Sequence, residues 1–225
     1  MDWIFRFQLF LFDFDGLLVD TERLHYQAYQ RMLQGRGLVL PWNFSAYLQI
    51  AHRGAHALKE EIYSAFPLLT EEAPDWNRLY QEKKQALFTL LEQEPVDLMP
   101  GAETLLKKLE DADIPRCIVT HSPRHLLELA SHHQPILRSI PCWITREDYT
   151  SPKPDPECYC LAITRFQAQN QAVIGFEDSY RGLQALLGTH AIPVFICPPE
   201  TKASLPSLPE RVLHASSLEF DFASF

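Results

Sequence analysis

Two aspartates, Asp13 and Asp15, stand two residues apart directly after the apolar run Leu9–Phe12 and are followed by Gly16. Such a run is typical of a buried strand, and the glycine allows the chain to turn sharply where that strand ends. Two carboxylates held together are costly to bury unless they share a proton or a cation. One of them can then act as a charged nucleophile or metal ligand while the other donates a proton. The pair predicts this division of labour.

Three further polar segments follow predicted strands. They are Thr120-His121-Ser122, the proline-flanked Lys153, and Glu177-Asp178. Taken singly, each has an ordinary explanation as a turn, a solvated lysine or a helix cap. Because the carboxyl ends of parallel strands meet at one edge of a sheet, the four segments together predict a single ligand site.

The combined residue types predict phosphoryl transfer. Asp13 and Asp178 offer the hard oxygen ligands that suit Mg²⁺, and Lys153 and Thr120 would hold and neutralise a phosphoryl group. The Mg²⁺ ion and the lysine would keep Asp13 ionised and nucleophilic. Asp15 would protonate the leaving oxygen and later activate water.

The elements that must position these residues alternate along the chain. Strand-like runs occupy residues 9–12, 114–120, 140–145, 172–176 and 192–196, and helical patterns lie at residues 105–109, 126–130, 159–166 and 183–187. Alternation of this kind predicts βαβ units and an α/β fold, in which helices cover both faces of a parallel sheet. The proline-containing tail at 198–209 is expected to be loop-rich.

Residues 21–92 interrupt this alternation. They contain no convincing strand, but Leu24, Ala28 and Met32 recur at helical spacing, as do the apolar residues of 79–91. A side-chain oxygen of Asp20 or Thr21 can cap the first of these helices. We therefore expect residues 21–92 to form an inserted helical domain and residues 1–20 and 93–225 to form the core domain.

Composition limits the classes of partner. With 20 Lys and Arg against 29 Asp and Glu, the net charge of −9 argues against a nucleic-acid-binding surface. No apolar stretch reaches the length of a membrane span, and Asp2 and Arg6 interrupt the apolar N-terminus, so a signal peptide is not expected. Five cysteines are an odd number in a chain of this length, which favours reduced thiols and a cytoplasmic protein.

The four segments resemble the motifs of the haloacid dehalogenase superfamily. Asp13-x-Asp15-Gly16 resembles the first motif, Thr120 the second, Lys153 the third and Glu177-Asp178-Ser179 the fourth. Residues 17–22, Leu-Leu-Val-Asp-Thr-Glu, continue the first motif in the style of the β-phosphoglucomutase-like branch. Met99-Pro100-Gly101 resembles the usual return from a helical cap. The likeness extends over residues 8–198.

The resemblance implies a Rossmann-like core with a four-helix cap. It implies that Asp13 becomes an aspartyl phosphate, and that Asp15 is the acid/base and a metal ligand through its backbone carbonyl. It also implies that Thr120 and Lys153 bind phosphate and that Asp178 completes the Mg²⁺ site. Aspartate at the second position of the motif argues against dehalogenation.

The expected substrate contacts are less specific. His121 and Ser122 adjoin Thr120, and their short segment next to a helix start favours an anion. In the cap, His25, Arg53 and Lys84 (or its neighbour Lys83) stand where similar mutases contact substrate, although such residues are often simply solvated. His121-Ser122-Pro123-Arg124 lacks the polar run typical of the mutase, which argues against mutase activity.

We therefore expect a monomeric, Mg²⁺-dependent phosphatase acting on a small phosphorylated metabolite such as a sugar phosphate or a nucleotide. One alternative is a sugar phosphomutase that uses the same aspartyl phosphate. Another is a phosphate-binding protein without turnover. The acid at Asp15 argues against this alternative, because a protein that only binds phosphate needs no proton donor there.

Overall fold

The computed structural model describes residues 2–51, 53, 55–203 and 205–220 of the chain. These residues form two compact units. The first unit contains the residues up to Asp20 and those from Val96 onward, and the second is Thr21–Pro95. The chain leaves the first unit after Asp20 and returns to it at Val96, and these two segments lie side by side. Val19 forms a β-bridge with Leu98, and the Asp20 amide donates to the Asp97 carbonyl at 2.9 Å.

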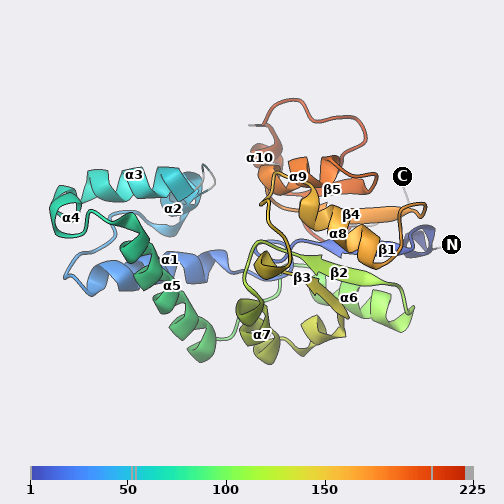
Figure 1. Ribbon diagram of the computed structural model, residues 1–225, viewed down its shortest axis with the longest axis horizontal. Helices are drawn as coiled ribbons and strands as arrows, with labels where there is room; N and C mark the ends of the chain where they lie inside the picture. The colour runs from blue at the N-terminus through green and yellow to red at the C-terminus, as the bar shows by residue number, and fades with distance from the viewer. Residues whose placement is uncertain (1, 52, 54, 204, 221–225) are drawn as a thin grey trace. The chain divides into compact units, whose positions relative to one another are not determined.

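Within its described part, the first unit holds a sheet of six strands (Figure 1), namely β1 (Leu9–Phe12), β2 (Arg116–Val119), β3 (Cys142–Ile144), β4 (Val173–Glu177), β5 (Ile192–Ile196) and β6 (Leu213–Ala215). Their order is β3-β2-β1-β4-β5-β6, and every neighbouring pair runs parallel. The predicted Rossmann-like α/β fold is thereby confirmed.

The strand order places a topological switch point between β1 and β4. From β1 the chain builds the sheet in one direction through β2 and β3, and it then returns past β1 to add β4, β5 and β6 in the other. In sheets of this kind a ligand binds beyond the carboxyl ends of the strands that flank the switch. Asp13 follows β1 and Asp178 follows β4, so both stand at that edge.

The connections of the first unit are short 3₁₀ turns and helices, namely η1 (Trp3–Arg6), α6 (Ala102–Asp111), α7 (Arg124–His133), η2 (Pro135–Ser139), η3 (Arg146–Asp148), α8 (Glu157–Arg165), α9 (Tyr180–Leu187) and α10 (Pro199–Ala203). Right-handed crossovers in opposite directions put α6 and α7 on one side of the sheet and α8 and α9 on the other, as Figure 1 shows.

Both faces of the sheet are apolar because its strands are nearly all buried. On one face, alternate β1 residues Leu9 and Leu11 pack with side chains of α8 and α9. On the other, the rings of Phe10 and Phe12 stack against Phe176 of β4, with centroids 6.1 and 5.0 Å apart. This packing on both faces fixes the carboxyl end of β1, where the paired aspartates begin.

The second unit is helical, as the residue spacing predicts, and its helices are α1 (Glu22–Gln34), α2 (Phe44–Ala51), α3 (Ala55–Ala65), α4 (Pro67–Glu72) and α5 (Trp76–Gln93). The described residues thus hold five helices, where the resemblance implies four, because Pro67 starts the short α4. An aromatic-rich core that includes Tyr29, Tyr47 and Ile62 joins them.

The structure adds two details to the sequence-based expectations. Thr21 precedes α1 but makes no side-chain cap, because its own backbone is helical (φ −84°, ψ −11°) rather than extended. The tail predicted to be loop-rich, 198–209, contains the five-residue helix α10. Beyond it lies β6, an edge strand that was not predicted because its three residues are only half-buried and therefore lack an apolar signature.

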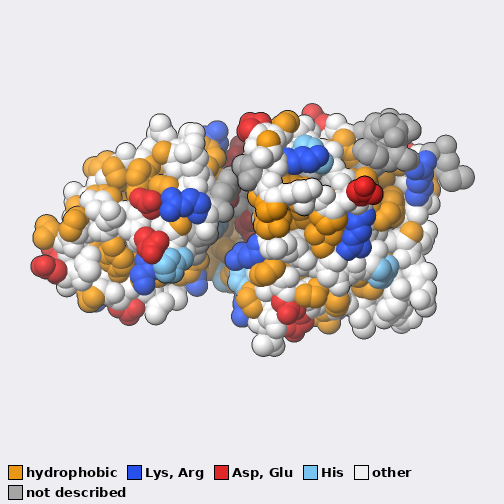
Figure 2. All heavy atoms as spheres, turned by 90° about the horizontal axis from the view of Figure 1, so that it is seen from above, with side chains coloured by type: hydrophobic (Ala, Val, Ile, Leu, Met, Phe, Trp, Pro, Cys, Tyr) orange, Lys and Arg blue, Asp and Glu red, His pale blue; other side chains and the backbone are white. Residues whose placement is uncertain are grey.

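The drawn face of the surface (Figure 2) carries charges of both signs. On the face drawn in Figure 2, acidic and basic side chains are interspersed among hydrophobic and neutral ones. None of the described helices is both long enough and apolar enough to cross a membrane.

Candidate active site

A buried lysine joins two of the predicted segments. The Nζ atom of Lys153 lies 2.5 Å from Oδ1 of Asp13 and 2.6 Å from Oε1 of Glu177, and it donates to the Val119 carbonyl at 2.9 Å. The side chains of Lys153 and Glu177 are almost fully buried, and that of Asp13 is 12% exposed. One ammonium therefore bridges the carboxyl ends of β1, β2 and β4.

The charge state of this group follows from its surroundings. Burial opposes a charged ammonium, but the carboxylates of Asp13 and Glu177 outweigh it and hold the pKa of Lys153 well above its usual range. Burial raises the pKa of Glu177, and the nearby ammonium opposes that rise. Lys153 is therefore a cation, and Glu177 is the carboxylate that anchors it.

Three contacts hold Glu177 in place. Tyr159 of α8 donates its hydroxyl to Oε1 at 2.5 Å, and Ser179 donates its hydroxyl to Oε2 at 3.2 Å. Gly182, in the first turn of α9, lies so close that any side chain there would collide with the Glu177 carboxylate. Both carboxylate oxygens are thus engaged by protein donors.

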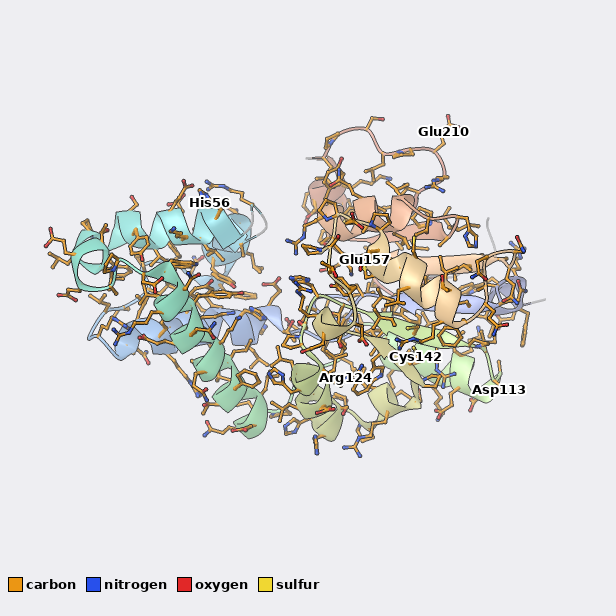
Figure 3. The ribbon with its side chains drawn as sticks, in the orientation of Figure 1. His56, Asp113, Arg124, Cys142, Glu157 and Glu210 are labelled. Atoms are coloured by element: carbon orange, nitrogen blue, oxygen red, sulfur yellow. The ribbon has the colours of Figure 1, made fainter. Side chains whose placement is uncertain are left out.

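The loop that carries Lys153 is tied to the start of α8. Glu157, labelled in Figure 3, accepts hydrogen bonds from the backbone amides of Thr150 and Ser151 at 2.9 and 2.6 Å. The Asp155 carboxylate accepts from the Glu157 amide at 2.9 Å. These bonds close the loop on the helix and give the lysine a fixed approach to the strand ends.

Asp15 contacts the segment that follows β2. Its Oδ2 atom accepts from the Ser122 hydroxyl at 2.5 Å and lies 3.4 Å from the Thr120 hydroxyl. The Thr120 oxygen in turn accepts from the Ser122 amide at 3.0 Å. The structure therefore brings the first and second predicted segments together, with Thr120 buried and Ser122 half-buried.

Asp178 approaches the turn after Asp15. Gly16 has a left-handed backbone (φ +78°), and a Cβ atom added there would overlap an oxygen of the Asp178 carboxylate. Glycine at this position thus serves two purposes, since it relieves the backbone and leaves room for a carboxylate beside the turn.

We expect Gly16→Ala to displace Asp178 and to raise the Mg²⁺ concentration for half-maximal activity at least about tenfold. Gly37→Ala is the matched control, because Gly37 has a similar backbone (φ +70°) and no described atom within 4 Å of its added Cβ. In both variants, an alanine in a left-handed backbone conformation lowers stability by about 1–2 kcal/mol. An unchanged Mg²⁺ dependence in Gly16→Ala would show that Asp178 does not need this space.

Among the described residues, Asp13, Glu177 and Asp178 bring ligand oxygens within 4.8 Å of one another. Asp15 adds a further carboxylate nearby, so the negative charge of these four acids exceeds the positive charge of Lys153. A phosphate dianion would add to that excess. The donor set therefore fits a hard divalent cation, with Asp13 and Asp178 as ligands, because Glu177 is already bonded to Lys153, Tyr159 and Ser179.

His121 is exposed and stands beside this group rather than in it. Its Nδ1 atom lies 3.0 Å from the Tyr149 hydroxyl, which also donates to the Thr120 carbonyl at 3.0 Å. Desolvation and the nearby cations Arg146 and Arg181 lower the pKa of His121. The ring is therefore neutral at physiological pH.

The candidates in the second unit make their own contacts there. His25 and the buried Lys83 are adjacent, with Nδ1 and Nζ 2.7 Å apart, and burial and this ammonium hold the pKa of His25 well below its usual range. Lys84 lies over the Tyr80 ring at 4.8 Å, and the exposed Arg53 pairs with Glu61 at 3.2 Å. Lys83, rather than Lys84, is thus the lysine that contacts His25.

Sequence reasoning missed three residues of the core site. Tyr159 was expected only as an apolar helix position, Tyr149 was not singled out, and Glu177 was interpreted with Asp178 as an acidic pair or a helix cap. The one available signal was that Glu177 ends an otherwise fully apolar strand, since a buried carboxylate requires a buried cation.

Comparison with known proteins places the chain in a family. Residues 7–188 match the family model of haloacid dehalogenase-like hydrolases. The chain belongs to that family and is an enzyme of the hydrolase class, as the motifs predict.

Particular relatives point in the same direction. The chain is 28% identical over 222 residues to a Drosophila melanogaster protein named "Probable pseudouridine-5'-phosphatase", covering 96% of this chain and 90% of the relative. It is 27% identical to the phosphorylated carbohydrates phosphatase of Thermotoga maritima, with 78% of each chain covered. The crystal structure of β-phosphoglucomutase from Clostridium difficile has the same fold, with a TM-score of 0.67, 20% identity, and 94% and 92% of the two chains covered.

Proposed function

We propose that this protein is a Mg²⁺-dependent phosphatase that hydrolyses a small phosphorylated metabolite through a phosphoaspartate at position 13. The observation that carries the proposal is the Asp13–Lys153–Glu177 group at the switch point of the sheet. It couples an ionised carboxylate to a fixed cation where a phosphate would bind. The phosphatase relatives support the reaction class.

In the first half-reaction, Asp13 attacks phosphorus and the bond to the leaving oxygen breaks. Lys153 and Thr120 would bind the phosphoryl oxygens and stabilise charge in the transition state. Asp15 would give its proton to the leaving alcohol. In the second half-reaction Asp15 takes a proton from water, which attacks phosphorus and releases inorganic phosphate and Asp13.

Mg²⁺ would be held by the carboxylates of Asp13 and Asp178 and by the backbone carbonyl of Asp15. When bound, it would neutralise the oxygens of the phosphoryl group. The close approach of Asp178 to Gly16 and the negative charge of the acidic group support this assignment.

Asp15→Asn should lower turnover by about 10²- to 10⁴-fold, because an amide can neither protonate the leaving oxygen nor accept a proton from water. Mg²⁺ binding should be largely retained, since the backbone carbonyl is unchanged. Steady-state kinetics with Mg²⁺ titration by calorimetry separates the two effects. Turnover within threefold of wild type would remove Asp15 from the reaction.

The predicted substrate contacts stay a proposal for each unit by itself. Thr120, His121 and Ser122 belong to the first unit, and His25, Arg53 and Lys84 or Lys83 to the second. Of the two lysines, the contact between Lys83 and His25 favours Lys83. We propose a monomer that acts in the cytoplasm, in line with the five free cysteines.

A screen of purified protein against phosphorylated metabolites, with Mg²⁺ and with or without a sugar bisphosphate, tests the proposal. Release of inorganic phosphate from a subset of esters is expected. Isomerisation of a sugar phosphate that requires the bisphosphate would instead identify a mutase. Binding of phosphate without turnover of any ester would identify a non-catalytic protein.

A further inference from the structure

The hydrogen bonds around His121 determine which of its two ring nitrogens carries the proton. A backbone carbonyl can only accept a hydrogen bond, so the 3.0 Å contact between Tyr149 and the Thr120 carbonyl uses the one hydroxyl proton of the tyrosine. The tyrosine oxygen can then only accept from His121, 3.0 Å away. The Nδ1 atom of His121 must therefore carry the ring proton.

The other ring nitrogen is consequently an acceptor. In a neutral imidazole with a protonated Nδ1, the Nε2 atom bears a lone pair. The ring is neutral because desolvation and nearby cations lower its pKa. Within the described residues Nε2 has no hydrogen-bond partner, and the side chain is exposed. An accessible acceptor thus stands at the rim of a site that otherwise presents a lysine and hydroxyl donors.

Such an acceptor is unsuited to phosphate, whose oxygens are themselves acceptors. His121 also adjoins a residue that contacts the proposed proton donor to the leaving group. Ser122, the next residue, bonds Asp15 at 2.5 Å, and Asp15 is the proposed proton donor to the leaving oxygen. Tyr149 holds the His121 ring, and the centroids of these two rings lie 6.2 Å apart.

We propose that His121 is a specificity residue that accepts, through Nε2, a hydrogen bond from a hydroxyl or N–H group on the organic part of the substrate. The enzyme would thus favour phosphate esters of polyhydroxylated or N–H-bearing leaving groups over plain alkyl esters. This inference rests on the proposed phosphatase function and adds the chemical class of its substrate.

Glycerol 1-phosphate and propyl phosphate form a matched pair of probes, because they differ only in two hydroxyl groups. The readout is the ratio of kcat/KM for the first ester to that for the second. A ratio is insensitive to the amount of folded enzyme and to general damage to the site. One neutral hydrogen bond contributes about 0.5–1.5 kcal/mol, so wild type should favour glycerol 1-phosphate by about two- to twelvefold.

His121→Phe keeps an aromatic ring beside Tyr149 but removes the acceptor, and it should bring the ratio close to one. His121→Gln offers an amide oxygen and should restore part of the preference. His125→Phe, a neighbouring histidine in α7, is the control and should keep the wild-type ratio.

Three results distinguish a failure of the proposed role of His121 from a failure of the proposed phosphatase function. A wild-type enzyme that hydrolyses both esters equally would overturn the role of His121, as would an unchanged ratio in His121→Phe. A wild-type protein that hydrolyses neither these esters nor any metabolite of the screen would overturn the proposed function itself.

Discussion

Asp13→Ala is expected to abolish hydrolysis of p-nitrophenyl phosphate, with a loss of at least about 10³-fold in kcat. The methyl side chain removes the nucleophile, and two of the neighbouring carboxylates are already engaged. Asp15 is engaged by Ser122, and Glu177 is bonded to Lys153 and Tyr159. Steady-state assays with saturating Mg²⁺ measure the effect.

Asp111→Ala is the matched control, because Asp111 is an exposed aspartate at the end of α6. It should retain wild-type activity. Hydrolysis by Asp13→Ala at the wild-type rate would contradict the nucleophile assignment, since no phosphoaspartate could then form at this position.

Lys153→Met is expected to reduce both turnover and stability. Turnover should fall about 10²- to 10³-fold, because a fixed cation is lost from the charge-stabilising set. The free energy of unfolding should fall by about 3–5 kcal/mol, because the buried Glu177 and Asp13 lose their shared ammonium. Urea denaturation at pH 7 measures the second effect.

The loss of stability in Lys153→Met should depend on pH, and the direction of that dependence can be worked out. In wild type, the pKa of Lys153 is raised, so the stability from its ion pairs is present below the ordinary lysine pKa and is lost only at higher pH. In the variant, Glu177 stays buried without its cation, and burial raises its pKa. Protonation of Glu177 in the folded state then favours folding, so the stability deficit should shrink as the pH falls from 8 to 5.

Two further variants separate the causes. Lys153→Met combined with Glu177→Gln removes the uncompensated charge and should recover part of the stability, but not the turnover. Lys107→Met, an exposed lysine of α6, should change neither quantity. A deficit in Lys153→Met that does not vary with pH would contradict the buried-charge explanation.

The sequence alone predicted most of the fold, and it predicted that the segments carrying polar residues meet at one edge of the sheet. Each segment that carries chemistry follows a short apolar run, and parallel topology brings the ends of such runs to one edge. The contacts of Asp13 with Lys153 and of Asp15 with Ser122 follow from that rule. The edge strand β6 was missed because its half-buried residues carry no apolar pattern.

Other parts of the site could not be predicted because they depend on side-chain direction. Tyr159 lies on a helix whose buried face is otherwise apolar, and only the packing of α8 on the sheet directs its hydroxyl at Glu177. The bond between Tyr149 and His121 joins residues 28 positions apart. Lys83 and Lys84 are adjacent in sequence, and only the rotation of α5 decides which of them is buried beside His25.

The central claim is that Asp13 carries the phosphoryl group during turnover, and chemical trapping tests it most directly. The enzyme is mixed with substrate and Mg²⁺, quenched in acid, and treated with borohydride, which reduces an acyl phosphate to an alcohol. Peptide mapping by mass spectrometry should then find homoserine at position 13, and only when substrate is present. Active enzyme in which position 13 stays aspartate, while another carboxylate is reduced in its place, would contradict the account.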